Sequence, residues 1–244
     1  MSVDTSSQAT IDFVVTGFGP FHDAPENPTT LLADKLCAYL SDKSTSYQRL
    51  VNVPVKTIVM ETSAAAVQKE INKLYQQTIQ EKKAHKEGTV TVLLHLGVNY
   101  RGKNFQVESC AYNDATFRVP DEQGYQPHNQ TIVSKHELGK PLGTLLDATK
   151  IVQQVNATNT GQDKKVETQA VVSLDPGRFV CNYVYCYSLD KFACNKESSS
   201  QSPFRCIFLH VPPAEVVGID EQLDFVARLM DAICKQIDAT MPVG

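Results

Sequence analysis

The sequence has no tryptophan, no apolar run long enough to cross a membrane and no cluster of lysine and arginine residues. A transmembrane helix needs about 20 consecutive apolar residues, so we expect no membrane partner. A formal net charge of −4 without a basic stripe also argues against nucleic-acid binding. With 42% hydrophobic and 20% charged residues, the composition is that of a globular protein.

The first ten residues are polar and lack the basic and apolar regions of a secretory signal peptide. We therefore expect residues 1–10 to be a disordered lead-in and the protein to be cytoplasmic. A chain of 244 residues can bury a sizeable core without disulfides or metals, and no linker divides it. We expect one domain over residues 11–244.

The cysteines lack the pattern of a disulfide framework or a zinc site, because their number is odd and no CxxC pair occurs. The seven are Cys37, Cys110, Cys181, Cys186, Cys194, Cys206 and Cys234. We expect no metal. The simplest interpretation of each cysteine is a small buried side chain, above all for Cys37 and Cys234, which lie in helical patterns.

Short apolar runs alternate with segments of helical spacing. The predicted strands are 11–16, 50–55, 89–96, 105–111, 167–173 and 205–211. The predicted helices are 30–40 (capped by Asn27 and Pro28), 59–79, 148–155, 179–192 and 219–237. The polar, turn-rich segments 124–143, 156–165 and 196–203 are predicted loops. This order predicts a single-domain three-layer α/β sandwich, with a twisted, mostly parallel sheet covered by helices on both faces.

Cys181 follows a predicted strand and a Pro176-Gly177 turn, at the start of an aromatic-rich helical segment. Ligands of open α/β sheets bind at the carboxyl ends of the strands. A helix amino terminus favours a thiolate and offers N–H groups to an oxyanion. The local pattern fits a nucleophile and a core cysteine about equally.

Two further residues are candidates for the same site. His210 ends an apolar strand just before Pro212, and a neutral histidine accepts protons near pH 7. A lone histidine there is more often structural, so the prediction depends on Cys181 as its partner. Glu108 interrupts a strand-like run and either orients the imidazole or faces solvent.

A glycine-rich turn, Gly17-Phe18-Gly19-Pro20-Phe21, follows the first predicted strand. It lacks the rest of the dinucleotide-binding fingerprint, and no P-loop lysine follows it. The two phenylalanines indicate an apolar pocket wall, with ordinary core packing as the alternative.

In this order and spacing, the segments resemble the pyroglutamyl-peptidase I family of cysteine peptidases over nearly the whole chain. The resembling blocks are Thr16–Phe21 with Asn27-Pro28, His95–Val98 with Glu108, Arg118–Asp121 with Gly124 and Gln126-Pro127, Gly177–Asn182, and His210–Pro212. Glu108, Cys181 and His210 match the positions of the family's catalytic triad.

The resemblance implies a twisted sheet flanked by helices, no cofactor, and hydrolysis of the amide bond after an amino-terminal pyroglutamyl (5-oxoprolyl) residue through a thioester. It implies that aromatic residues form the ring pocket, with Asn27 nearby and Arg118 in the oxyanion region. Apolar walls suit a neutral, flat lactam. The implied substrate-binding positions are Phe18, Phe21, Asn27, Arg118, Val119, Phe179 and Val180.

The sequence also departs from the family. Ser109 stands where many relatives have a basic residue, Val98 stands where some bacterial members have glutamine, and residues 126–146 diverge. Two other functions stay open: a thiol-dependent amidase acting on another blocked acyl group, and a non-catalytic small-molecule-binding domain. The intact Cys-His-Glu set favours an enzyme over the latter. Monomer and homo-oligomer are both open.

Overall fold

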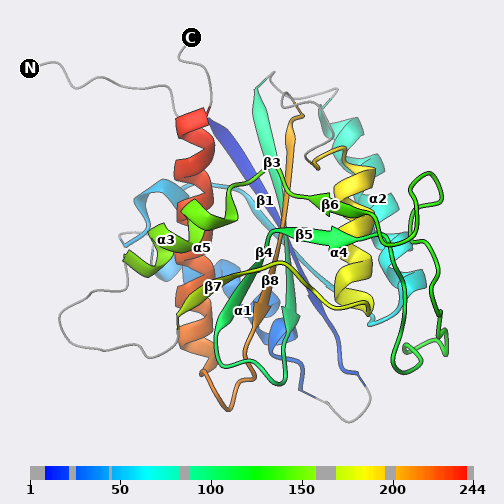
Figure 1. The fold of residues 1–244 in the computed structure, drawn as a ribbon. Helices are drawn as coiled ribbons and strands as arrows, with labels where there is room; N and C mark the ends of the chain where they lie inside the picture. The colour runs from blue at the N-terminus through cyan, green and yellow to red at the C-terminus, as the bar shows by residue number, and fades with distance from the viewer. Residues whose placement is uncertain are drawn as a thin grey trace, which may run out of the picture.

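The computed structural model describes residues 9–21, 26–43, 46–82, 88–157, 169–195 and 202–240. Within these ranges a six-stranded sheet forms the centre of the molecule (Figure 1). Its order is β2 (Val55–Met60), β1 (Thr10–Phe18), β3 (Thr89–Val98), β8 (Phe204–Val211), β4 (Phe105–Glu108) and β7 (Ala170–Ser173). The first four strands are mutually parallel, whereas β4 runs antiparallel to β8 and parallel to β7.

Helices cover both faces of this sheet, which confirms the predicted α/β sandwich. One face carries α1 (Pro28–Asp42), α3 (Ala148–Ala157) and α5 (Ile219–Thr240). The other carries α2 (Ala64–Lys82) and α4 (Val180–Lys191), which lie together in Figure 1. A small second sheet pairs β5 (Cys110–Tyr112) with β6 (Pro141–Gly143), and a short 3-10 helix, η1, spans Gln48–Leu50.

Alternation along β8 assigns its side chains to two cores. Ile207 and Leu209 pack with the α5 layer, while Cys206 and Phe208 pack with the α4 layer. Successive side chains of a strand point to opposite faces, so His210 lies on the α4 face.

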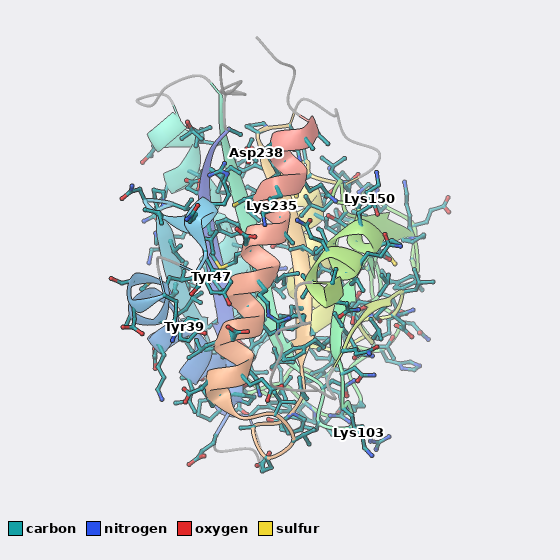
Figure 2. All side chains as sticks on the ribbon, turned by 90° about the vertical axis from the view of Figure 1, so that its left-hand side faces the viewer. Tyr39, Tyr47, Lys103, Lys150, Lys235 and Asp238 are labelled. Carbon is teal, nitrogen blue, oxygen red and sulfur yellow. The ribbon has the colours of Figure 1, made fainter. Side chains whose placement is uncertain are left out.

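Polar contacts along the outer side of α5 fix this helix to the rest of its layer. The hydroxyl groups of Tyr39 and Tyr47 both donate to Asp224, at 3.1 and 2.6 Å. Nearer the carboxyl end, Arg49 pairs with Asp238 at 2.7 Å. Figure 2 shows the two tyrosines beside the first half of α5 and Asp238 close to its last turn.

Some predicted boundaries are wrong for local reasons. The predicted strand 50–55 is wrong: Leu50 ends η1, a turn follows in which Asn52 has a left-handed φ of 64°, and strand β2 begins only at Val55. The predicted helix 59–79 begins only at Ala64. The predicted strand 105–111 divides at Ser109, whose carbonyl accepts a hydrogen bond from Thr144 N.

Four predicted elements fall partly on residues outside the described ranges. These are residues 1–8 of the lead-in, 158–165 of one predicted loop, 167–168 of the predicted strand 167–173 and 196–201 of another loop. Thr10 already belongs to β1, so the expected lead-in is shorter than ten residues. Among the described helices, none combines the length and apolar character of a membrane span.

Candidate active site

Cys181 lies in the first turn of α4, as its sequence context predicts. The preceding turn needs Gly177, whose φ of +80° is left-handed, and Gly177 N donates to Asp175 Oδ1 at 3.1 Å. Phe179 caps the helix in an extended conformation, and its side chain makes no capping hydrogen bond. The N–H groups of the first turn therefore remain available around the half-buried thiol.

Gly97 on β3 brings the thiol close to the sheet. A β-carbon on this glycine would lie only 2.9 Å from Cys181 Sγ and 2.6 Å from Phe208 Cζ. The parallel register pairs Gly97 with His210 on β8. The thiol therefore lies directly beside the imidazole and contributes to the raised pKa of His210.

Glu108 completes a line of three polar side chains. Its Oε1 lies 2.8 Å from His210 Nδ1, and both residues are buried. The antiparallel register of β4 and β8 places Glu108 opposite Phe208, on the same face as His210. Tyr185, on α4, donates its hydroxyl proton to the backbone carbonyl of Glu108 at 3.0 Å.

These contacts favour a charged imidazole. Burial by itself lowers the pKa of His210, but the hydrogen bonds with Cys181 and then Glu108 outweigh it and raise the pKa to about 9. A protonated imidazole beside a thiol stabilises the thiolate. The arrangement suits a thiolate–imidazolium nucleophile oriented by a carboxylate.

Aromatic rings gather next to Cys181. The ring of Phe179 lies 5.1 Å from that of Phe21 and 4.7 Å from that of Phe117, and Phe117 also contacts Tyr183 at 6.2 Å. Phe21 and Phe179 are predicted from the sequence, whereas Phe117 is not, because a single phenylalanine between polar residues has no periodicity to identify it.

The other predicted substrate-binding residues occupy different environments. Phe18 and Val180 are almost fully buried in the core behind the aromatic rings. Asn27 is also buried: its Oδ1 accepts from Thr29 N, and its Nδ2 donates to the carbonyl of Gly19. Arg118 is exposed and Val119 partly exposed on the segment that follows Phe117.

The segment 112–116 clamps the start of α4. Asn182 is fully buried; its Oδ1 accepts from Tyr112 N at 2.8 Å, and its Nδ2 donates to the carbonyls of Tyr112 and Asp114. Thr116 N donates to the carbonyl of Arg178, whose guanidinium lies 3.5 Å from Asp114. Asn182 directly follows the nucleophile candidate, so this clamp restrains the backbone at Cys181.

The divergent segment 126–146 is organised around one buried side chain, that of Asn113. Its Oδ1 accepts from Ile132 N and Val133 N. Its Nδ2 donates to the carbonyls of Val133, His136 and Glu137. The segment is therefore held against the layer of α4, although most of it has neither helix nor strand.

The described residues contain no cluster of three or more histidine, cysteine, aspartate or glutamate side chains suited to a metal ion. The seven cysteines are free thiols, and Cys37 is exposed rather than buried as its helical pattern predicted. Cys234 is buried, as expected.

Comparison with known proteins places this geometry in context. The family model described as "Pyroglutamyl peptidase" matches residues 11–238. The pyrrolidone-carboxylate peptidase of Thermococcus litoralis is 28% identical over 207 residues, covering 84% of this chain and 79% of the relative. Human pyroglutamyl-peptidase 1 is 25% identical over 224 residues, covering 92% and 88%.

Solved structures show the same fold. The pyrrolidone carboxyl peptidase of Thermococcus litoralis superimposes with a TM-score of 0.70 at 20% identity, covering 96% of this chain and 97% of that one. The enzyme of the same name from Thermus thermophilus gives a TM-score of 0.65 at 21% identity, covering 92% and 99%.

Proposed function

This chain belongs to the pyroglutamyl peptidase family, and we propose that it removes amino-terminal pyroglutamate from peptides through a triad of Cys181, His210 and Glu108. The observation that carries the proposal is the contiguous line of these three side chains. His210 lies beside Cys181 on one side, and on the other its Nδ1 lies 2.8 Å from Glu108 Oε1.

In the proposed reaction, His210 takes the proton of Cys181, and the thiolate attacks the carbonyl carbon of the pyroglutamyl residue. The C–N bond then breaks as the imidazolium protonates the leaving amine, which leaves a thioester on Cys181. His210 next removes a proton from water, and the hydroxide attacks the thioester. Pyroglutamate leaves, and the thiol regains its proton.

Two other groups support this sequence. Glu108 accepts the Nδ1 proton of His210 in a hydrogen bond, which keeps Nε2 directed at the sulfur. Backbone N–H groups in the first turn of α4 stabilise the oxyanion, since the N-cap residue Phe179 has no side-chain group that binds them. We assign Arg118 to the same region on the basis of the family resemblance.

The lactam ring is proposed to lie against Phe21, Phe117 and Phe179. Their edge-to-face and tilted contacts form an apolar wall suited to a neutral ring. Phe18 and Val180 support this wall from the core, and Asn27 holds the adjoining turn at Gly19. We assign Val119 to the wall on the basis of the family resemblance. We propose that no cofactor takes part and that residues 11–244 act as one domain.

The direct test is hydrolysis of pyroglutamyl-aminomethylcoumarin by the purified chain and by Cys181→Ala. The variant should lose at least about 10³-fold in kcat because nucleophile removal eliminates the covalent route. Cys37→Ala, which replaces an exposed cysteine of α1, is the matched control and should keep full activity. Circular dichroism should show that both variants remain folded.

Full activity in Cys181→Ala would overturn the assignment. A panel of other N-blocked aminoacyl-aminomethylcoumarins distinguishes the alternatives. Preference for another blocked acyl group would indicate a different thiol amidase. The absence of hydrolysis across the panel, together with an unreactive Cys181, would indicate a binding domain.

A further inference from the structure

A second polar contact lies on the same line between α4 and β3 as the nucleophile. Cys181 and Ser188 are seven residues apart on α4, and Gly97 and His95 are two residues apart on β3. Residues with these spacings share one face of a helix and one face of a strand. Cys181 Sγ contacts β3 at Gly97, and Ser188 contacts it at His95.

The contact at His95 is a complete hydrogen-bond network. His95 Nε2 lies 3.0 Å from Ser188 Oγ, and Nδ1 lies 2.7 Å from Thr16 Oγ1 on β1. All three side chains are buried, and His95 and Ser188 have no exposed surface. Both ring nitrogens therefore have partners, as a neutral imidazole with one donor and one acceptor requires.

The network has no acid–base function in the proposed reaction. Burial lowers the pKa of His95 to about 3, so the ring is neutral at working pH. An apolar side chain would fill the same space without defining where α4 lies along β3. A hydrogen bond defines that position, because a shift of the helix would leave buried polar atoms unpaired.

We propose that His95 and Ser188 form a positioning pair that fixes α4 on β3 and thereby holds Cys181 beside His210. Gly97 has no side chain to stop the helix from moving along the strand. The nearest polar contact on this line is two turns further along α4, at Ser188. The expected effect on kcat rests on the proposed function. The expected effect on the placement of the Cys181 thiol beside the His210 imidazole does not.

Two pairs of variants test the proposal. Ser188→Ala and Thr16→Val each remove one buried hydroxyl from the same imidazole, but only Ser188→Ala breaks the link to α4. His95→Gln places an amide near the position of Nε2 and can still reach Ser188. His95→Asn places its amide near the position of Nδ1 and can reach only Thr16.

The readouts are kcat and KM for pyroglutamyl-aminomethylcoumarin, the melting temperature, and the rate of iodoacetamide alkylation at Cys181 followed by peptide mass spectrometry. Ser188→Ala should lower kcat about 5- to 50-fold by misplacing the nucleophile, with KM little changed because the aromatic wall is intact. Alkylation of Cys181 should slow as well, because the thiol loses its contact with His210.

Thr16→Val should lower the melting temperature by about 2–4 °C. Its kcat and its alkylation rate at Cys181 should stay near those of the unmodified protein. His95→Gln should have a higher kcat and a faster alkylation of Cys181 than His95→Asn. Equal rates in Ser188→Ala and Thr16→Val would overturn the proposal, as would equal rates in the two His95 variants.

The alkylation rates separate this proposal from the proposed function. If the unmodified chain does not hydrolyse the substrate, the assigned activity fails, but the rates at Cys181 still decide whether the pair positions the thiol. If Ser188→Ala does not fold, the comparison of His95→Gln with His95→Asn decides it.

Discussion

His210 Nδ1 lies 2.8 Å from Glu108 Oε1, while Oε2 of the same carboxylate has no hydrogen-bond partner among the residues that the structure describes. Glu108 has no exposed surface, so solvent does not compensate for the missing partner. A buried carboxylate is costly unless it is paired. The carboxylate therefore depends on the imidazole, and the imidazole in turn depends on Glu108 for its orientation.

Replacing Glu108 by Gln should reduce kcat about 10²- to 10⁴-fold, because the amide no longer enforces the tautomer that directs Nε2 at Cys181. KM should change little, since Glu108 does not contribute to the aromatic wall. Steady-state hydrolysis of pyroglutamyl-aminomethylcoumarin measures both constants. Glu221→Gln, an exposed carboxylate on α5, is the control, and comparable kcat values in the two variants would contradict the orienting role.

Alkaline pH should destabilise the fold through His210. Its pKa rises from 6.5 to about 9 in the folded state, despite burial, because of the hydrogen bonds with Cys181 and Glu108. Between these two values the folded state binds more protons than the unfolded state, so stability decreases as pH rises from about 6.5 through 9. Thermal melts across this window measure the decrease.

The matched variant for this experiment is Cys181→Ala, which removes the first of the two hydrogen-bond partners of His210. Its melting temperature should depend less on pH between about 6.5 and 9 than that of the unmodified protein. If the melting temperatures of the two proteins change with pH in parallel, the thiol does not raise the pKa of His210.

The fold class was predictable because the apolar periodicity that defines it is local. The strand at 89–96 and the helix at 219–237 were found within a few residues of β3 and α5. The break at Ser109 was not predictable, because it depends on a hydrogen bond from Thr144, a residue far along the chain. Similarly, only the left-handed conformation of Asn52 reveals that a turn precedes β2.

The candidate site was only partly predictable for a related reason. Local pattern left Cys181 and His210 ambiguous, and the family resemblance selected them. Their contact depends on strand register, which pairs Gly97 with His210. Phe117 and Asn182 acquire their roles from partners distant in sequence, so no short motif identifies them.

Adding one methyl group at Gly97 should inactivate the enzyme. In Gly97→Ala the new carbon would lie 2.9 Å from Cys181 Sγ and 2.6 Å from Phe208 Cζ, so α4 or Phe208 must move. Overpacking of this kind costs about 1–3 kcal/mol of stability, and we expect kcat to fall at least about 10²-fold. In Gly218→Ala the added carbon would have no described atom within 4 Å beyond the adjoining residues, so this variant should change neither stability nor kcat. Normal turnover by Gly97→Ala would show that the close approach of the thiol to β3 is not required.

Shortening Phe117 to leucine should weaken substrate binding more than turnover. The ring contacts Phe179 at 4.7 Å, and such aromatic pairs contribute about 0.5–1.5 kcal/mol beyond their buried area. KM should therefore rise about 3- to 10-fold, with kcat nearly constant. Phe192→Leu is the matched control, because this ring makes a similar contact with Phe204 at 4.9 Å at the far end of α4. A rise in KM in both variants would trace the effect to general loosening of the α4 layer.

Acid should destabilise the fold through His95, with the opposite sign to His210. Burial lowers the pKa of His95 from 6.5 to about 3, so the folded state keeps the ring neutral while the unfolded chain protonates it. The contribution to stability is present above pH 6.5 and is lost as pH falls from 6.5 toward 3. Urea midpoints between pH 7 and about 4 should therefore fall more steeply for the unmodified protein than for His95→Gln, whose side chain does not titrate. His128→Gln, which replaces an exposed histidine, should follow the unmodified protein. If His95→Gln loses stability with acid as steeply as the unmodified protein does, other buried groups govern acid unfolding.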